Sequence, residues 1–135
     1  MPEIIVLDTH IWLWFVNQDL DKFPLHWQER IEVAYRVGIS PVSCFEIALA
    51  CKKGRLILPC ETSEWINAAL EPSGIEIFPL TPTIASCAVN LSEIHKDPFD
   101  RIIIATAIEY NSSLASIDGV FSKYPELNGC LMKME

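Results

Sequence analysis

Four acidic residues have the chemistry and the positions to form a catalytic site. They are Asp8, Glu46, Asp100 and Asp118, and each follows a predicted strand or lies in the first turn of a predicted helix. Carboxylates that meet within about 4 to 6 Å repel one another unless a cation lies among them. Oxygen ligands without a His or Cys set favour Mg²⁺ or Mn²⁺ over Zn²⁺. Mg²⁺ keeps bound water, so this pattern predicts metal-dependent hydrolysis of phosphodiester bonds.

The predicted elements explain how acids far apart in the sequence can meet. We expect strands at 3–8, 39–42, 75–79, 113–117 and 129–134, and helices at 9–17, 24–37, 43–53, 62–74, 82–91 and 99–110. Gly38 is expected to end the second of these helices. Strands that alternate with helices predict an α/β fold with a mostly parallel sheet covered on both faces. In such a sheet, the turns after the strands gather at one edge, where ligands bind.

Each acid also has a purely structural explanation at a helix start or a turn. These explanations are a capping box from Ser43 to Glu46, a helix cap at Asp97 with Asp100 in the first turn, a cap at Asp8, and a turn at Asp118-Gly119. Taken singly, each explanation is better than a catalytic one. Taken together, the acids favour one pocket, because capping positions of successive strand–helix units lie along one rim of the sheet.

Composition limits the other classes of protein. A chain of 135 residues with 50% hydrophobic residues predicts one folded domain, residues 1–135. No apolar stretch approaches the roughly 20 residues of a membrane span, and the first residues lack the features of a signal peptide, so we expect a cytoplasmic protein with no membrane association. Five cysteines without a C-x-x-C pair indicate neither a disulfide framework nor a zinc site. The five dispersed glycines form no nucleotide-binding loop.

Basic residues are few and local. The formal net charge of −8 argues against broad, non-specific attraction to nucleic acid. Lys96 and Arg101 flank the turn that precedes Asp100, and we expect this pair to border a substrate groove. A second group, within 52–55, is equally well explained as a solvated helix end. The histidines have no metalloprotease spacing, and we expect them to be structural.

Four segments resemble a known family in their order and spacing. They are IIVLDTHIWLW (4–14), SCFEIALACKKGRLILP (43–59), HKDPFDRIIIATA (95–107) and SIDGVF (116–121). Together they are similar to PIN-domain ribonucleases of the toxin type found in VapBC toxin–antitoxin pairs. The third segment is the most specific match, and the resemblance covers nearly the whole chain.

The resemblance implies a small three-layer α/β/α domain that binds Mg²⁺ or Mn²⁺ and cuts RNA. Its acidic quartet corresponds to the four carboxylates named above, with Asp8 and Asp100 as the strongest metal ligands. Thr9 would orient a ligand or a water through its hydroxyl. Arg101 would either pair with an acid or meet a phosphate. The resemblance also implies a homodimer and a cognate antitoxin that covers the active site.

A second hypothesis remains open, namely a non-catalytic PIN-like binding module. In that case the acids act only as caps, and an apolar surface recognises a protein or an RNA. The segment 11–16 is apolar on all sides, which predicts burial on more than one side. Core packing is its default explanation, and part of it, or of the helix with Trp27, could instead belong to an interface.

Overall fold

The central strand β1 (Ile4–Leu7) shows why the sheet has an apolar core on each of its faces. In this computed structural model, which describes residues 2–135, Ile5, Val6 and Leu7 are all fully buried. Ile5 and Leu7 belong to one apolar core, and Val6 belongs to the other. Successive side chains of a strand point to opposite faces, so a continuous aliphatic run requires cover on both faces.

Within residues 2–135, the sheet has four strands, all parallel, in the order β3-β2-β1-β4. Its other strands are β2 (Arg36–Ile39), β3 (Glu76–Ile77) and β4 (Ser113–Ala115). The helices are α1 (Thr9–Val16), α2 (Leu25–Val33), α3 (Pro41–Lys52), α4 (Thr62–Ala68), α5 (Pro82–Asn90) and α6 (Pro98–Glu109). This arrangement confirms the predicted α/β class with a parallel sheet.

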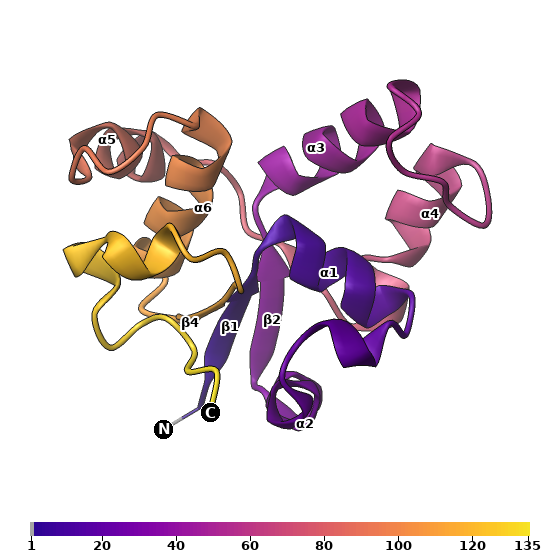
Figure 1. Cartoon of the computed structure of the whole chain (residues 1–135), viewed down its shortest axis with the longest axis horizontal. Helices are drawn as coiled ribbons and strands as arrows, with labels where there is room; N and C mark the ends of the chain where they lie inside the picture. Colours follow the sequence, from indigo (N-terminus) through magenta and orange to yellow (C-terminus); the bar gives the residue numbers. More distant parts are fainter. Residues whose placement is uncertain (1) are drawn as a thin grey trace.

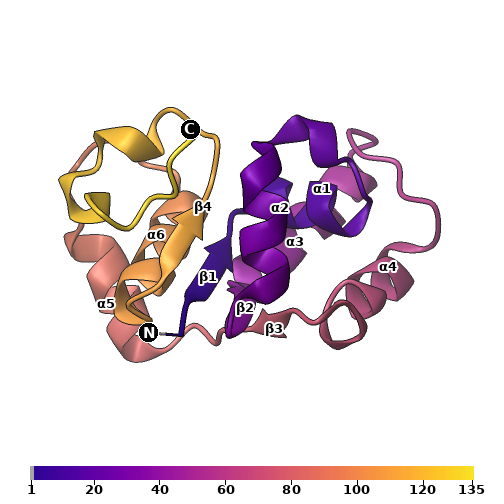
Figure 2. The ribbon, with the colours of Figure 1, turned by 90° about the horizontal axis from the view of Figure 1, so that it is seen from below.

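Helices cover both faces of the sheet and leave the carboxyl ends of the strands accessible. Trp12 of α1, Trp27 of α2 and Trp65 of α4 pack into the core with Ile5 and Leu7. The opposite core contains residues of α6 and of the short 3₁₀ helices Phe121–Lys123 and Pro125–Leu127. In Figures 1 and 2, α5 and α6 lie toward β4, whereas α1 to α4 lie toward β2.

The second predicted helix is too long, and Gly38 does not end it. The helix α2 ends at Val33, and Gly38 lies inside β2. A Cβ on Gly38 would lie 2.5 Å from the ring of Phe78. The glycine is therefore required by close packing within the fold and not by the end of a helix. The predicted strand 39–42 is shifted toward the N-terminus, because β2 covers Arg36–Ile39 and Pro41 already begins α3.

Two further segments differ from their predicted secondary structure. The predicted strand 129–134 is reduced to one parallel bridge between Leu114 and Leu131. The predicted helix 62–74 ends at Ala68 and is followed by a 3₁₀ turn, Glu71–Ser73. Pro72 has no backbone N–H to donate and lies in the 3₁₀ turn that follows α4. The apolar residues of both segments still pack against the cores.

The apolar segment 11–16 packs as core. Ile11, Trp12 and Leu13 are buried, and the remaining three residues are partly buried against the same cluster. Core packing therefore explains the segment. Within residues 2–135, no helix is long and apolar enough to cross a bilayer.

Candidate active site

Asp8 ends β1 and begins α1 at the carboxyl edge of the sheet. Its backbone is extended, and one carboxylate oxygen accepts a hydrogen bond of 2.8 Å from the backbone N–H of Thr9. Its other oxygen accepts a 2.8 Å hydrogen bond from the hydroxyl of Ser116. Burial raises the pKa of Asp8, although both hydrogen bonds oppose this effect. The predicted helix cap at Asp8 is confirmed, and the same side chain faces a pocket.

Glu46 approaches the end of β1 from α3. Thr9 Oγ1 donates to Glu46 Oε1 at 2.6 Å, and Thr9 Oγ1 also lies 2.8 Å from Ser43 Oγ. Burial is the main cause of the raised pKa of Glu46, and the charge of Asp8 adds to it. Thr9 thus holds a carboxylate of the site in place.

The predicted capping box from Ser43 to Glu46 is wrong. The helix α3 begins two residues earlier, with Pro41 in its first turn and Ser40 as its cap. The hydroxyl of Ser40 accepts a 3.3 Å hydrogen bond from the N–H of Val42. Proline is favoured at the first helical position, so Pro41 moves the helix start toward Ser40. Glu46 is therefore not needed to cap the N-terminus of α3, and its carboxylate can face the pocket.

Asp100 lies in the first turn of α6. Asp97 caps this helix by accepting a 3.0 Å hydrogen bond from the N–H of Phe99, as predicted. Burial, and then repulsion from Asp97 and the other three acids, raises the pKa of Asp100 to about 7. Its Oδ2 lies 3.5 Å from Nε2 of His95. Asp100 is the carboxylate that a nearby cation would stabilise most.

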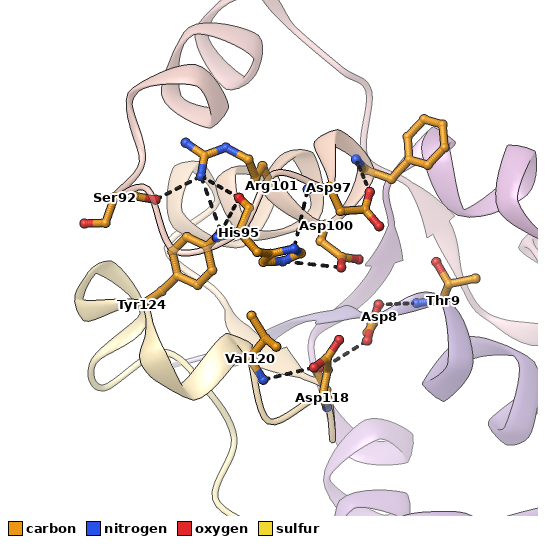
Figure 3. Close-up of polar contacts among 12 residues, drawn as sticks. Asp8, Thr9, Ser92, His95, Asp97, Asp100, Arg101, Asp118, Val120 and Tyr124 are labelled. Atoms are coloured by element: carbon orange, nitrogen blue, oxygen red, sulfur yellow. Dashed lines mark hydrogen bonds and ion pairs between the residues drawn. The ribbon is translucent and has the colours of Figure 1, made fainter.

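Asp118 follows β4 and completes the group. Its carboxylate accepts a 2.9 Å hydrogen bond from the N–H of Val120, which confirms the predicted turn. Its own N–H donates to Ser116 Oγ, the hydroxyl that also binds Asp8. The turn therefore links Asp118 to Asp8 through one shared serine, and Figure 3 shows the two aspartates next to each other.

The four acids line one pocket of about 430 Å³. Its lining residues are Asp8, Thr9, His10, Trp14, Glu46, Asp97, Asp100, Ile117 and Asp118. In the described part of the chain, this lining includes no lysine or arginine. The sequence interpretation did not assign His10 or Asp97 to this site. Both could have been inferred, because His10 follows Thr9 at the start of α1 and Asp97 caps the helix that carries Asp100.

The donor set fits a hard divalent cation. Across residues 2–135, no three acidic, His or Cys side chains are already arranged as a complete set of ligands. Mg²⁺ characteristically keeps several waters and uses only one or two protein carboxylates directly. Closely grouped, partly buried carboxylates whose pocket, among the described residues, is lined by neither lysine nor arginine are suited to such an ion.

The predicted substrate-binding pair lies outside this pocket. Arg101 donates to backbone carbonyl groups of α5 and the following loop and to one hydroxyl; the acceptors are Ala88, Val89, Leu91, Ser92, His95 and Tyr124. Figure 3 shows the guanidinium directed toward Ser92. Within the described chain, Arg101 forms no ion pair with an acid. Lys96 is exposed and lines a neighbouring groove between α5 and α6.

Comparison with known proteins gives the family. Residues 5–127 match the sequence pattern of the PIN domain family. The chain belongs to that family. This confirms the resemblance found in the four sequence segments. Ribonuclease VapC22 of Mycobacterium tuberculosis is 30% identical to this PIN domain over 115 residues, which cover 84% of this chain and 86% of the relative.

Solved structures agree with this PIN domain in their fold. VapBC2 from Rickettsia felis, bound to a DNA fragment from its promoter, gives a TM-score of 0.69 at 19% identity, covering 98% of this chain and 99% of the other. DNA-bound VapBC from Salmonella typhimurium gives 0.63 at 18% identity, covering 93% and 95%. A toxin–antitoxin complex from Klebsiella pneumoniae gives 0.62 at 20% identity, covering 97% and 98%.

Proposed function

We propose that this PIN domain is a ribonuclease that hydrolyses phosphodiester bonds with Mg²⁺ or Mn²⁺ as its cofactor. The observation that carries the proposal is the convergence of four carboxylates, from four separate segments, on one pocket without lysine or arginine in its lining. The raised pKa of Asp100 supports it, because a bound cation would offset the burial and the repulsion that raise this pKa.

The roles of the side chains follow from their positions. We assign Asp8 and Asp100 as the main metal ligands, with Glu46 and Asp118 completing the set directly or through water. Thr9 keeps Glu46 oriented by its 2.6 Å hydrogen bond. A divalent cation at this point supplies a Lewis acid that offsets charge developing on the phosphate and lowers the pKa of an attacking water.

RNA is proposed as the substrate because the relative at 30% identity is named a ribonuclease. The acidic pocket itself repels a polyanion, so affinity must come from bases at its border. Lys96 is exposed on the loop that precedes Asp97 and is free to contact a phosphate. The donors of Arg101 are already engaged by backbone oxygens, which favours a supporting role for this residue.

We further propose that the protein is the toxin of a toxin–antitoxin pair, acting in the cytoplasm as a homodimer that a cognate antitoxin inhibits. The support is the likeness in fold to VapBC proteins over nearly the whole chain. Co-expression with the product of a neighbouring small gene tests this part. Formation of a complex that suppresses RNA cleavage is expected, and failure of every such product to bind would contradict it.

Cleavage assays test the catalytic proposal. The purified protein should cut single-stranded RNA with Mg²⁺ or Mn²⁺ and lose this activity in EDTA. Asp8→Asn and Asp100→Asn should each reduce cleavage by about 100-fold or more, because each removes a charged ligand. Glu64→Gln, a change to an exposed acid on α4, is the control and should have no effect.

The same panel separates the alternatives. Cleavage of duplex RNA or of DNA instead of single-stranded RNA would revise the substrate. A folded, metal-loaded protein that cuts none of these nucleic acids would refute the nuclease and favour the non-catalytic binding module.

A further inference from the structure

His95 lies directly beside Asp100, on the loop that leads into α6. Its Nε2 atom is buried, lies 3.5 Å from Asp100 Oδ2, and has no hydrogen-bond partner within residues 2–135. The other ring nitrogen, Nδ1, accepts a 3.4 Å hydrogen bond from the backbone N–H of Asp97. A nitrogen that accepts carries no proton, so this bond leaves the ring proton on Nε2. Oδ2 of Asp100 is then an acceptor within 3.5 Å of the protonated nitrogen.

The backbone of His95 is held from two sides. Arg101 Nη1 donates to the His95 carbonyl at 3.3 Å, and the Tyr124 hydroxyl lies 3.3 Å from the same oxygen. The His95 N–H lies 3.4 Å from the Tyr124 hydroxyl oxygen. The His95 and Tyr124 rings pack edge to face, with 6.0 Å between their centroids. Figure 3 shows His95 between Tyr124 and Asp100, with Arg101 in contact with the His95 carbonyl oxygen.

We propose that His95 is a positioning residue that orients the Asp100 carboxylate toward the metal pocket. Its Nε2 lies 3.5 Å from Oδ2 of Asp100, so an Nε2–H donor can hold that oxygen and leave Oδ1 for the cation. Arg101 and Tyr124 act through His95 by fixing its backbone and ring. This inference rests on the proposed function, because it assigns the outer partner of one proposed metal ligand. Such partners of ligating carboxylates typically affect metal affinity or activity by about 10- to 100-fold.

A merely structural role would need only the shape of the ring. The buried Nε2 argues against that role, because a buried polar atom without a hydrogen-bond partner is costly. The contact of 3.5 Å is longer than a good hydrogen bond, and a small rotation of the Asp100 side chain would shorten it.

The test compares three replacements of His95. His95→Phe keeps the flat ring without nitrogen, His95→Gln can place an N–H close to the Nε2 position, and His95→Asn reaches only the Nδ1 position. We expect Phe and Asn to weaken Mn²⁺ binding about 10-fold, measured by calorimetry, and Gln to stay within about 3-fold of the wild type. With RNA as the substrate, kcat should fall in the Phe and Asn variants and stay near the wild-type value in the Gln variant. KM should stay unchanged in all three variants. His26→Gln, at an exposed histidine on α2, is the control.

Two results would overturn the proposal. One is wild-type Mn²⁺ affinity and kcat in His95→Phe. The other is an equal loss in Gln, Asn and Phe variants that unfold at the wild-type temperature, because the donor at Nε2 would then be irrelevant.

A measurement on the metal-free protein separates this inference from the proposed function. Nitrogen-15 NMR of the histidine rings at pH 8 should show the proton of His95 on Nε2, and Asp100→Asn should shift that signal, whereas Glu64→Gln should not. A proton on Nδ1, or no response to Asp100→Asn, would refute the contact. If the NMR result holds and the wild type binds no Mn²⁺ and cuts no RNA, the proposed function fails while the His95–Asp100 contact stands.

Discussion

Asp100 is placed where the protein disfavours its charged form. Burial and neighbouring carboxylates raise its pKa from an ordinary 3.8 to about 7. An acid whose pKa is raised by folding destabilises the fold as the pH rises from the unfolded pKa to the folded one. The site is therefore expected to reduce stability in the metal-free protein above pH 4, with the full effect above pH 7.

Replacing this charge should stabilise the metal-free protein. In EDTA at pH 8, we expect Asp100→Asn to raise the free energy of unfolding by up to about 4 kcal/mol, since one pKa unit corresponds to about 1.4 kcal/mol. The gain should shrink toward pH 4. Thermal unfolding across this pH range measures it, with the exposed Glu64→Gln as control. A variant no more stable than the wild type at pH 8 would contradict the prediction.

Gly38 offers a test of packing at a single residue. Any Cβ at this position would lie 2.5 Å from Phe78, whose ring stacks on Tyr110 at 4.2 Å and under Arg36 at 4.9 Å. The ring has little room to move, so Gly38→Ala should cost about 1 to 3 kcal/mol in the free energy of unfolding. Gly119→Ala is the matched control, because within residues 2–135 no atom beyond the adjoining residues lies within 4 Å of its added Cβ. Equal urea midpoints for the two variants would refute the steric argument.

The start of α6 matters at the scale of the element, because it sets the position of Asp100. Asp97 is both the cap of this helix and a charge near the site. Asp97→Asn and Asp97→Ala both remove the charge, but only asparagine keeps a good capping oxygen. The alanine variant should therefore be less stable than the asparagine variant by about 1 kcal/mol in urea unfolding. Equal stability would show that the cap contributes nothing.

The net charge of −8 governs nucleic-acid binding at the scale of the whole molecule. Affinity for RNA then depends on a few local bases, of which Lys96 adjoins the proposed site. In the Asp8→Asn background, in which cleavage should be slower by about 100-fold or more, Lys96→Ala should weaken binding to single-stranded RNA. It should also reduce the slope of log affinity against log salt by about 0.7. Lys22→Ala, at an exposed lysine that is distant from Lys96 in the sequence, is the control. An unchanged slope would remove Lys96 from the RNA contacts.

Local patterns in the sequence determine much of this molecule. The aliphatic run 4–7 must be a strand buried on both faces, and Asp8 and Asp97 begin helices because capping depends on residues close in sequence. Parallel strand–helix units then place the residues after each strand at one edge, so the convergence of the four acids could be anticipated.

Contacts between distant residues decided the rest. Position 38 in β2 requires a glycine because the ring of Phe78 packs where a Cβ would lie, and Arg101 binds carbonyl groups of α5 and the loop after it instead of an acid. The contact between His95 and Asp100 depends on how Tyr124 and Arg101 hold one loop. Local periodicity predicts which face of an element is apolar. It does not predict which residue, distant in the sequence, packs against that face. Those partners are chosen only when the two cores close around the sheet.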